Sequence, residues 1–85
     1  MRSRVAVVGI IVEDPDSTPT LNSLLHEYAP YIVGRMGIPY RQRGIAIISI
    51  AVDAPQDTIS AMVGKIGSIP GISAKTAYSN AIFDD

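Results

Sequence analysis

The chain contains no cysteine, and this absence removes several kinds of chemistry at once. Without thiols there can be no disulfide, no thiolate metal site and no cysteine nucleophile. An excess of one charge is missing as well, since seven Lys and Arg stand against eight Asp and Glu. A domain that binds nucleic acid through its phosphates usually has a clear basic excess. We therefore expect no direct contact with nucleic acid.

Long apolar runs are also absent. Residues 5–12 form an apolar run too short to span a bilayer, and Glu13 and Asp14 follow it directly. The run therefore predicts a strand and not a signal peptide or a membrane segment. We expect no membrane partner and a cytoplasmic location. Eighty-five residues are enough for one domain, residues 1–85.

Two apolar runs dominate what remains. Residues 5–12 and 45–52 are rich in β-branched side chains and apolar on both alternating faces, which predicts two strands buried on both sides. The runs align at an offset of 40, which indicates an internal pseudo-repeat. In this repeat Lys75 occupies the position equivalent to Arg35.

A helix is predicted after each of these strands. Thr18 can cap the first helix, with Pro19 at its first position, and Pro55 precedes the second. Each helix has an apolar stripe with the spacing i, i+3, i+4, i+7. The stripes are Leu21, Leu24, Leu25 and Tyr28 in the first helix, and Ile59, Met62, Val63 and Ile66 in the second.

Two weaker strands complete the fold. Residues 31–38 contain glycines and precede Pro39, and residues 72–78 alternate with small and polar side chains, so both predict edge strands. The element order is then βαββαβ. It predicts an α+β, ferredoxin-like fold, a four-stranded antiparallel sheet with two helices on one face and the first and third strands in its centre.

This arrangement leaves one face of the sheet without helices, although both faces of the central strands are apolar. The competing sets are Val5, Val7 and Ile11 against Ala6, Val8, Ile10 and Val12, and Ile45 and Ile47 against Ala46, Ile48, Ile50 and Val52. Another copy of the chain is the simplest cover for the set that the helices do not reach. We therefore expect a homo-oligomer through the open sheet face.

Residues 34–44 are the best candidate for a binding site. Arg35 lies in a predicted edge strand, Arg41 and Arg43 flank the predicted hairpin turn, and Tyr40 is available for stacking. These side chains could bind a small-molecule effector or a protein partner through an anionic group. Alternatively, cations on an edge strand only prevent unwanted sheet extension.

Two other groups are weaker candidates. Glu13 and Asp14, with Asp16, could bind a ligand or a hard cation, but this stretch also contains the residues of a turn and a helix cap. His26 is the only histidine and is predicted to face solvent. It could bind metal only together with carboxylates from several copies, so we predict no metal site in the monomer and no cofactor. No catalytic triad or phosphate-binding loop is visible, and we do not expect an enzyme.

Several runs together resemble a known family. They include Leu25-His26-Glu27-Tyr28, Asp53-Ala54-Pro55, Gly64-Lys65-Ile66-Gly67 and, most specifically, Gly34-Arg35-Met36-Gly37-Ile38-Pro39-Tyr40-Arg41. Over about residues 5–78 the chain is similar to the regulators of iron-only hydrogenase systems, small stand-alone bacterial proteins. The resemblance implies an ACT-like form of the ferredoxin-like fold, similar to the C-terminal domain of nickel-responsive repressors.

The resemblance also sets expectations for function. Nickel-responsive repressors bind their metal through several histidines and a cysteine, so their nickel site is not carried over to this chain. Their DNA-binding arm is not expected either, because the first predicted strand starts at Val5. ACT-like modules usually hold effectors where the first loop of one copy meets another copy. The resemblance thus implies a regulatory, ligand-binding homo-oligomer without a DNA-binding segment of its own.

Overall fold

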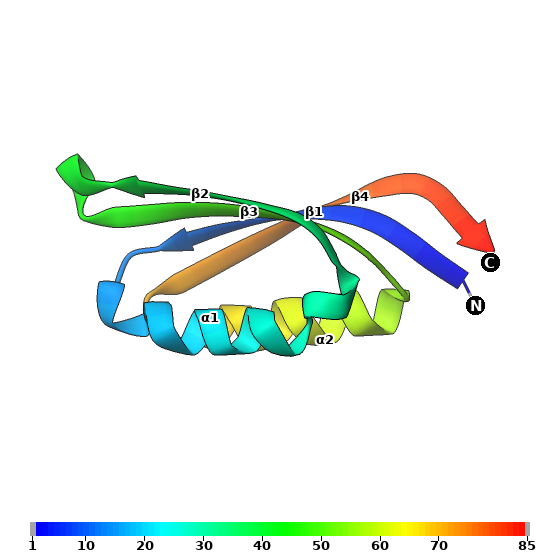
Figure 1. Ribbon diagram of the computed structural model, residues 1–85, viewed down its shortest axis with the longest axis horizontal. Coiled ribbons are helices and arrows are strands. Elements are labelled where there is room, and N and C mark those ends of the chain that lie inside the picture. The colour runs from blue at the N-terminus through cyan, green and yellow to red at the C-terminus, as the bar shows by residue number, and fades with distance from the viewer. Residues whose placement is uncertain (1, 85) are drawn as a thin grey trace.

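Both helices lie on the same face of one antiparallel sheet in the computed structural model, which describes residues 2–84 (Figure 1). The strands are β1 (Arg2–Val12), β2 (Ile32–Tyr40), β3 (Ile45–Ala54) and β4 (Ile72–Asp84), and the helices are α1 (Thr18–Glu27) and α2 (Gln56–Gly67). The strand order is β2-β3-β1-β4, so the two apolar strands are central. The predicted α+β, ferredoxin-like fold is confirmed.

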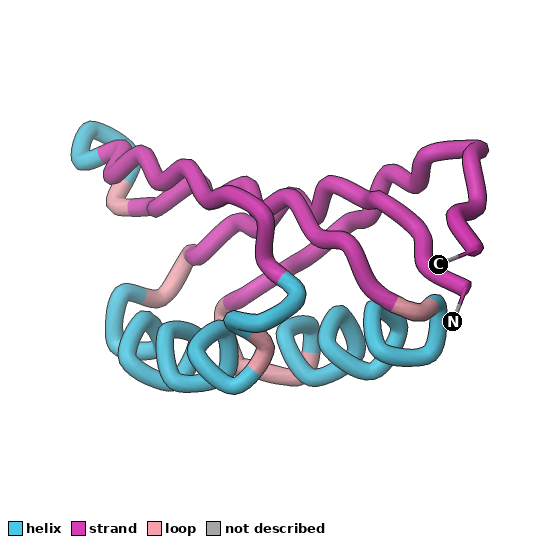
Figure 2. Tube along the Cα trace, turned by 45° about the vertical axis from the view of Figure 1, so that its right-hand side comes forward, coloured by secondary structure: helices cyan, strands magenta, loops and turns pink. Residues whose placement is uncertain are grey.

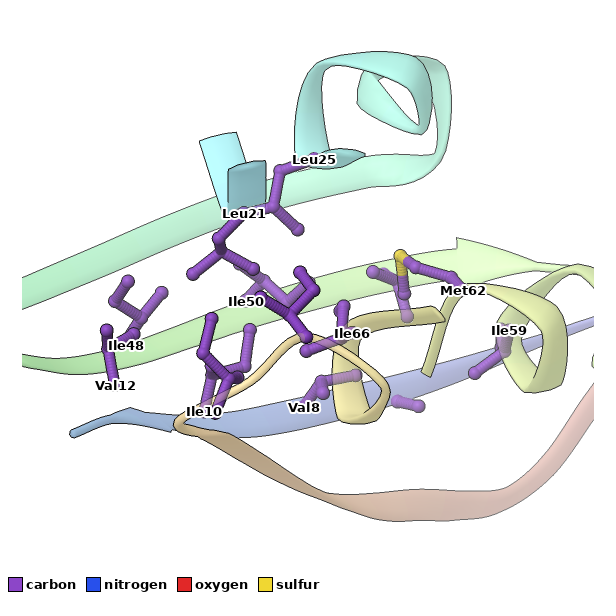
Figure 3. Packing of buried hydrophobic residues seen from close by; sticks show 14 of the residues in the cluster. Val8, Ile10, Val12, Leu21, Leu25, Ile48, Ile50, Ile59, Met62 and Ile66 are labelled. Carbon is purple, nitrogen blue, oxygen red and sulfur yellow. The ribbon is translucent and has the colours of Figure 1, made fainter. Parts of the chain in front are cut away.

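The core lies between the sheet and the two helices. Figure 3 shows Val8 and Ile10 from β1 and Ile50 from β3 packed against Leu21 of α1 and Ile66 of α2, all fully buried. In the two predicted stripes, Leu24, Tyr28 and Val63 are only partly buried and pack against the edge of this core. Each fully buried aliphatic side chain stabilises the fold by about 1.5–3 kcal/mol before conformational entropy is subtracted. The helices are therefore held on the sheet mainly by their stripes.

The start of α1 differs from the prediction. Thr18 is the first helical residue, and the N-cap is Ser17, whose side chain makes no capping hydrogen bond. Its hydroxyl instead donates to the carbonyl oxygen of Pro70 at 2.6 Å. The Ser17 hydroxyl thus donates to a distant carbonyl oxygen, and its oxygen accepts no hydrogen bond from the N–H groups of the helix. Pro19 lies in the first turn, where its missing N–H costs no helical hydrogen bond.

The outer strands and strand ends extend beyond the predicted bounds. β1 begins at Arg2 and β4 continues to Asp84, because these ends pair with each other as far as Arg2 opposite Asp84. A register shift between Arg4 and Ala6 interrupts this pairing. The ends of the described chain lie side by side in both views (Figures 1 and 2). Backbone pairing needs no apolar side chains, so hydrophobic patterning gave no signal for these extensions.

The sheet face opposite the helices carries the other apolar set. By register, Met36, Ser49, Gly9 and Lys75 form one row across the four strands on this face. Val7, Met36 and Ile38 expose 46%, 52% and 47% of their surface. We call this surface the open face, and its apolar members are Val5, Val7, Ile11, Met36, Ile38, Tyr40, Ile45, Ile47, Ala51 and Ala77. The helices cover the other apolar set of the central strands, which contains Ile10 and Ile50. The sequence had left open which of the two sets faces the helices.

The hairpin between β2 and β3 gives the molecule its elongated shape. The described chain measures 43 × 19 × 17 Å, and Figure 1 shows the hairpin reaching past the start of α1. A short 3-10 turn, Arg41–Arg43, connects the two strands and ends at Gly44 with φ of 67°. A left-handed backbone at this position suits glycine because it has no Cβ. Gly44 therefore closes the hairpin turn without backbone strain.

Candidate functional site

The structure separates the arginines that are close together in sequence. Arg35 is opposite Ile50, which is buried under the helices, so Arg35 lies on the helix face of β2. Tyr40 is opposite Ile45 on the open face. Arg41 and Arg43 lie in the hairpin turn at the end of the sheet. The four predicted contact residues thus do not form a single site.

A hollow of about 330 Å³ lies between the β2–β3 hairpin and the loop that leads from β1 to α1. Its lining is Val12, Pro15, Thr18, Pro39, Arg41, Gly44, Ile45 and Ala46. We call it the hairpin hollow. Arg41 is the one charged residue among these lining residues, and most of the wall is apolar. This combination is typical of a pocket for a small molecule with one anionic group.

Glu13 and Asp14, the acidic candidates, lie in the loop between β1 and α1, where they form hydrogen bonds within the protein. The carboxylate of Asp14 accepts a hydrogen bond from the backbone N–H of Asp16 at 3.0 Å. The backbone N–H of Glu13 donates to the carbonyl oxygen of Gly71 at 2.7 Å. Neither Glu13 nor Asp14 lines the hairpin hollow. The turn interpretation accounts for the Asp14 carboxylate, and ligand binding by the pair stays a prediction.

A second hollow, of about 390 Å³, lies between α1 and β2, and we call it the α1–β2 hollow. Its lining is Asn22, Leu25, His26, Ala29, Ile32 and Arg35. The guanidinium Nη2 of Arg35 donates to Oδ1 of Asn22 at 2.8 Å. His26 is exposed, as predicted, but it shares this hollow with Arg35. The sequence gave no indication that these two residues lie on the same hollow.

A metal site has no support from the described chain. Within residues 2–84, no group of three or more His, Asp or Glu side chains lies close enough to hold a metal ion. A site built from His26 and carboxylates of several copies stays a prediction. Metal analysis of protein purified without added metal would test it.

Comparison with known proteins places this fold in a family. A model of the TM1266-like family, described as "Iron-only hydrogenase system regulator, putative", matches residues 4–76. The chain belongs to this family. It is 34% identical to the uncharacterized protein TM1266 from Thermotoga maritima, over 89% of this chain and 96% of that one, with a TM-score of 0.86. The family resemblance that the sequence suggested is confirmed.

A more distant solved structure shares only the fold with this TM1266-like chain. It is a formyltetrahydrofolate deformylase from Pseudomonas putida KT2440, which is 14% identical and has a TM-score of 0.65. The match covers 91% of this chain and 29% of the deformylase. No curated protein sequence matches the chain. Within residues 2–84, neither helix of this family member has the length and apolar character needed to cross a membrane.

Arg4 is a polar residue of this TM1266-like chain that sequence reasoning missed. Its guanidinium donates from Nη1 to Oε1 of Gln56 and from Nη2 to the carbonyl oxygen of Ser79, both at 2.8 Å. It also lies 4.4 Å from the centre of the Tyr78 ring, within reach of a cation–π interaction. Arg4 thus ties the start of α2 to the irregular part of β4. Arg4 lies two residues before Ala6, so it shares the alternating positions of β1 that face the helices. This spacing could have indicated from the sequence that Arg4 points toward α2.

Lys65 makes a similar contact between the helices. Its ammonium nitrogen lies 5.3 Å from the centre of the Tyr28 ring. A hydrogen bond with the Tyr28 hydroxyl is the main cause that raises the pKa of Lys65 above its ordinary value. Lys65 does not line either hollow.

Proposed function

We propose that the protein is a small regulatory module that binds a small-molecule effector in the hairpin hollow and acts as a homo-oligomer through its open face. The description of its family as a regulator supports the regulatory role and the connection with an iron-only hydrogenase system. The observation that carries the proposal is the hollow itself, whose lining is mostly apolar and includes one cationic residue, Arg41. No catalytic step is part of this function.

The lining of the hairpin hollow restricts the chemistry of the effector. Val12, Pro39 and Ala46 offer apolar contact, and Arg41 offers a fork of N–H donors for a carboxylate or a phosphate. A hollow of about 330 Å³ is at the small end of the range for ligand pockets. The best fit is a small anion with a short apolar body, in the size range of an amino acid or a short-chain carboxylate.

Replacing Arg41 with alanine should weaken binding of such an effector by about tenfold or more, because a charge-assisted hydrogen bond is lost. Arg43→Ala is the matched control, since Arg43 lies in the same turn but does not line the hollow. Isothermal titration calorimetry, after a thermal-shift screen of small carboxylates and phosphates, measures both variants. Equal losses in the two variants would show that general charge attraction and not the hollow binds the anion.

The open face supports association of several copies. Its apolar side chains come from all four strands and are exposed or only partly buried. A standard interface removes about 800 Å² from each partner. The total accessible surface is 5309 Å², so such an interface would cover roughly 15% of it. Covering it removes apolar surface from water without any change in the core.

Ile38→Lys should therefore turn the oligomer into a folded monomer, because a charge on this face cannot be buried in the contact without a partner. Ser23→Lys is the control, since it adds the same charge at an exposed position of α1. Light scattering coupled to size-exclusion chromatography measures the mass of each protein at several concentrations. A monomeric wild type would contradict the proposed oligomer. An Ile38→Lys variant that is still oligomeric would show that the interface lies on another surface.

A further inference from the structure

The α1–β2 hollow is lined by hydrogen-bond donors and apolar groups and by no carboxylate. Arg35 contributes a guanidinium from the edge strand, and Asn22 and His26 contribute an amide and an imidazole from α1. Leu25, Ala29 and Ile32 complete its lining. An imidazole carries at least one N–H in both of its ordinary protonation states. The polar part of this hollow is thus suited to an anion.

The hydrogen bond between Arg35 and Asn22 fixes which groups remain available. A guanidinium can only donate, so the Asn22 amide must turn its oxygen toward Arg35, as it does at 2.8 Å. The two N–H bonds of the amide nitrogen then point away from Arg35. Arg35 itself retains further N–H groups beyond this single bond. Both side chains therefore fix each other's position and still have N–H groups that can donate to a ligand.

Arg35 forms no ion pair with the described residues. Within residues 2–84 the one ion pair joins Arg2 and Asp84, at 3.2 Å, at the far ends of β1 and β4. Arg35 is exposed, so its charge needs no partner for folding. A guanidinium held by a neutral amide keeps its charge for a ligand and loses less side-chain freedom when the ligand binds.

We propose that the α1–β2 hollow is a second ligand site, which binds a small oxyanion, a carboxylate or a phosphate, through Arg35, Asn22 and His26. It is separate from the hairpin hollow, because the two share no lining residue. The inference goes beyond the proposed function and does not depend on it. The competing explanation is that the bond between Arg35 and Asn22 only holds α1 against β2.

Asn22→Asp separates these two explanations. An aspartate at this position still accepts the hydrogen bond from Arg35 and gains an ion pair with it, so a tether between α1 and β2 is kept or strengthened. An oxyanion site, in contrast, loses the amide donor and gains a negative charge. Asn80→Asp is the matched control, because Asn80 is exposed on β4 at the opposite edge of the sheet. The two variants differ from the wild type by the same charge and the same atoms.

The test is a titration of the ¹⁵N-labelled full chain, followed by NMR, with inorganic phosphate in one series and propionate in another, at constant ionic strength. We expect at least one anion to give saturable shifts at the Asn22 side-chain amide and the Arg35 Nε–H. Asn22→Asp should weaken this binding by about tenfold or more, and Asn80→Asp by less than about twofold. Saturation by phosphate alone or by propionate alone identifies the anion.

Further variants keep the inference falsifiable. Arg35→Gln removes the charge at an exposed position and should abolish saturation, and it decides the question if Asn22→Asp does not fold. Arg41→Ala should leave the shifts unchanged, because Arg41 does not line the α1–β2 hollow. Binding at the α1–β2 hollow is thus tested separately from binding at the hairpin hollow. Shifts that grow without saturation for both anions would overturn the inference. Asn22→Asp binding as tightly as the wild type, or Arg41→Ala abolishing the shifts, would overturn it as well.

Discussion

Replacing Ile50 with alanine should lower the free energy of unfolding by about 2–5 kcal/mol, which is a large part of the stability of so small a domain. Ile50 is fully buried between the sheet and the helices. Its truncation removes buried apolar surface and leaves a cavity that the neighbouring side chains fill only partly. Urea denaturation at a low protein concentration measures the effect.

Ile47→Ala is the matched change on the other face of the same strand. Ile47 lies on the open face and is only partly buried. At low concentration its truncation should cost about 1 kcal/mol or less. If the open face is an interface, the loss of unfolding free energy caused by Ile47→Ala grows as the protein concentration is raised. The loss caused by Ile50→Ala is already large in the monomer. A cost at position 47 that does not depend on concentration would contradict an interface at this place.

Replacing Gly71 with alanine should destabilise the protein by about 2–4 kcal/mol through two separate effects. Gly71 has φ of 76°, where a side chain costs about 1–2 kcal/mol. An added Cβ would also lie 2.5 Å from Cβ of Asp14 and 3.2 Å from its backbone nitrogen. The loop after β1 and the turn before β4 would have to move apart, which would strain the hydrogen bond from Glu13 to Gly71.

Gly44→Ala isolates the first effect from the second. Gly44 also has positive φ, 67°, but an added Cβ would meet no atom within 4 Å. This variant should therefore lose only about 1–2 kcal/mol. Urea denaturation of the two variants side by side gives the difference. Equal losses would mean that the turn before β4 relaxes and that the close approach to Asp14 carries no cost.

The fold could be predicted from sequence because the residues that form the clearest apolar pattern are also those whose burial contributes most to stability. The two central strands and the helix stripes contain the residues that are buried, so the pattern of apolar residues describes the core directly. The extended ends of β1 and β4 depend on backbone pairing, which the pattern does not record. The N-cap was predicted one residue too late because a 3-10 turn, Pro15–Ser17, runs directly into α1 and the Ser17 side chain makes no capping bond.

The candidate site was harder to predict. The sequence spacing itself shows part of the reason. Arg35 and Tyr40 are five residues apart in one strand, and an odd separation places them on opposite faces. The pseudo-repeat gave a wrong equivalence for Lys75. It is opposite Gly9 and lies on the open face, whereas Arg35 is opposite Ile50 on the helix face. The neighbours of each arginine come from other elements, and no local pattern predicts them.

The pairing of Arg2 with Asp84 brings the outer ends of β1 and β4 together, as the β2–β3 hairpin joins the other two strands. A chain joined between Asp84 and Arg2 by a short turn, and opened between Arg41 and Gly44, would run β3-α2-β4-β1-α1-β2. This order is again βαββαβ, with each half of the pseudo-repeat in the place of the other. The two half-units could therefore exchange places along the chain while the strand order of the sheet stays the same.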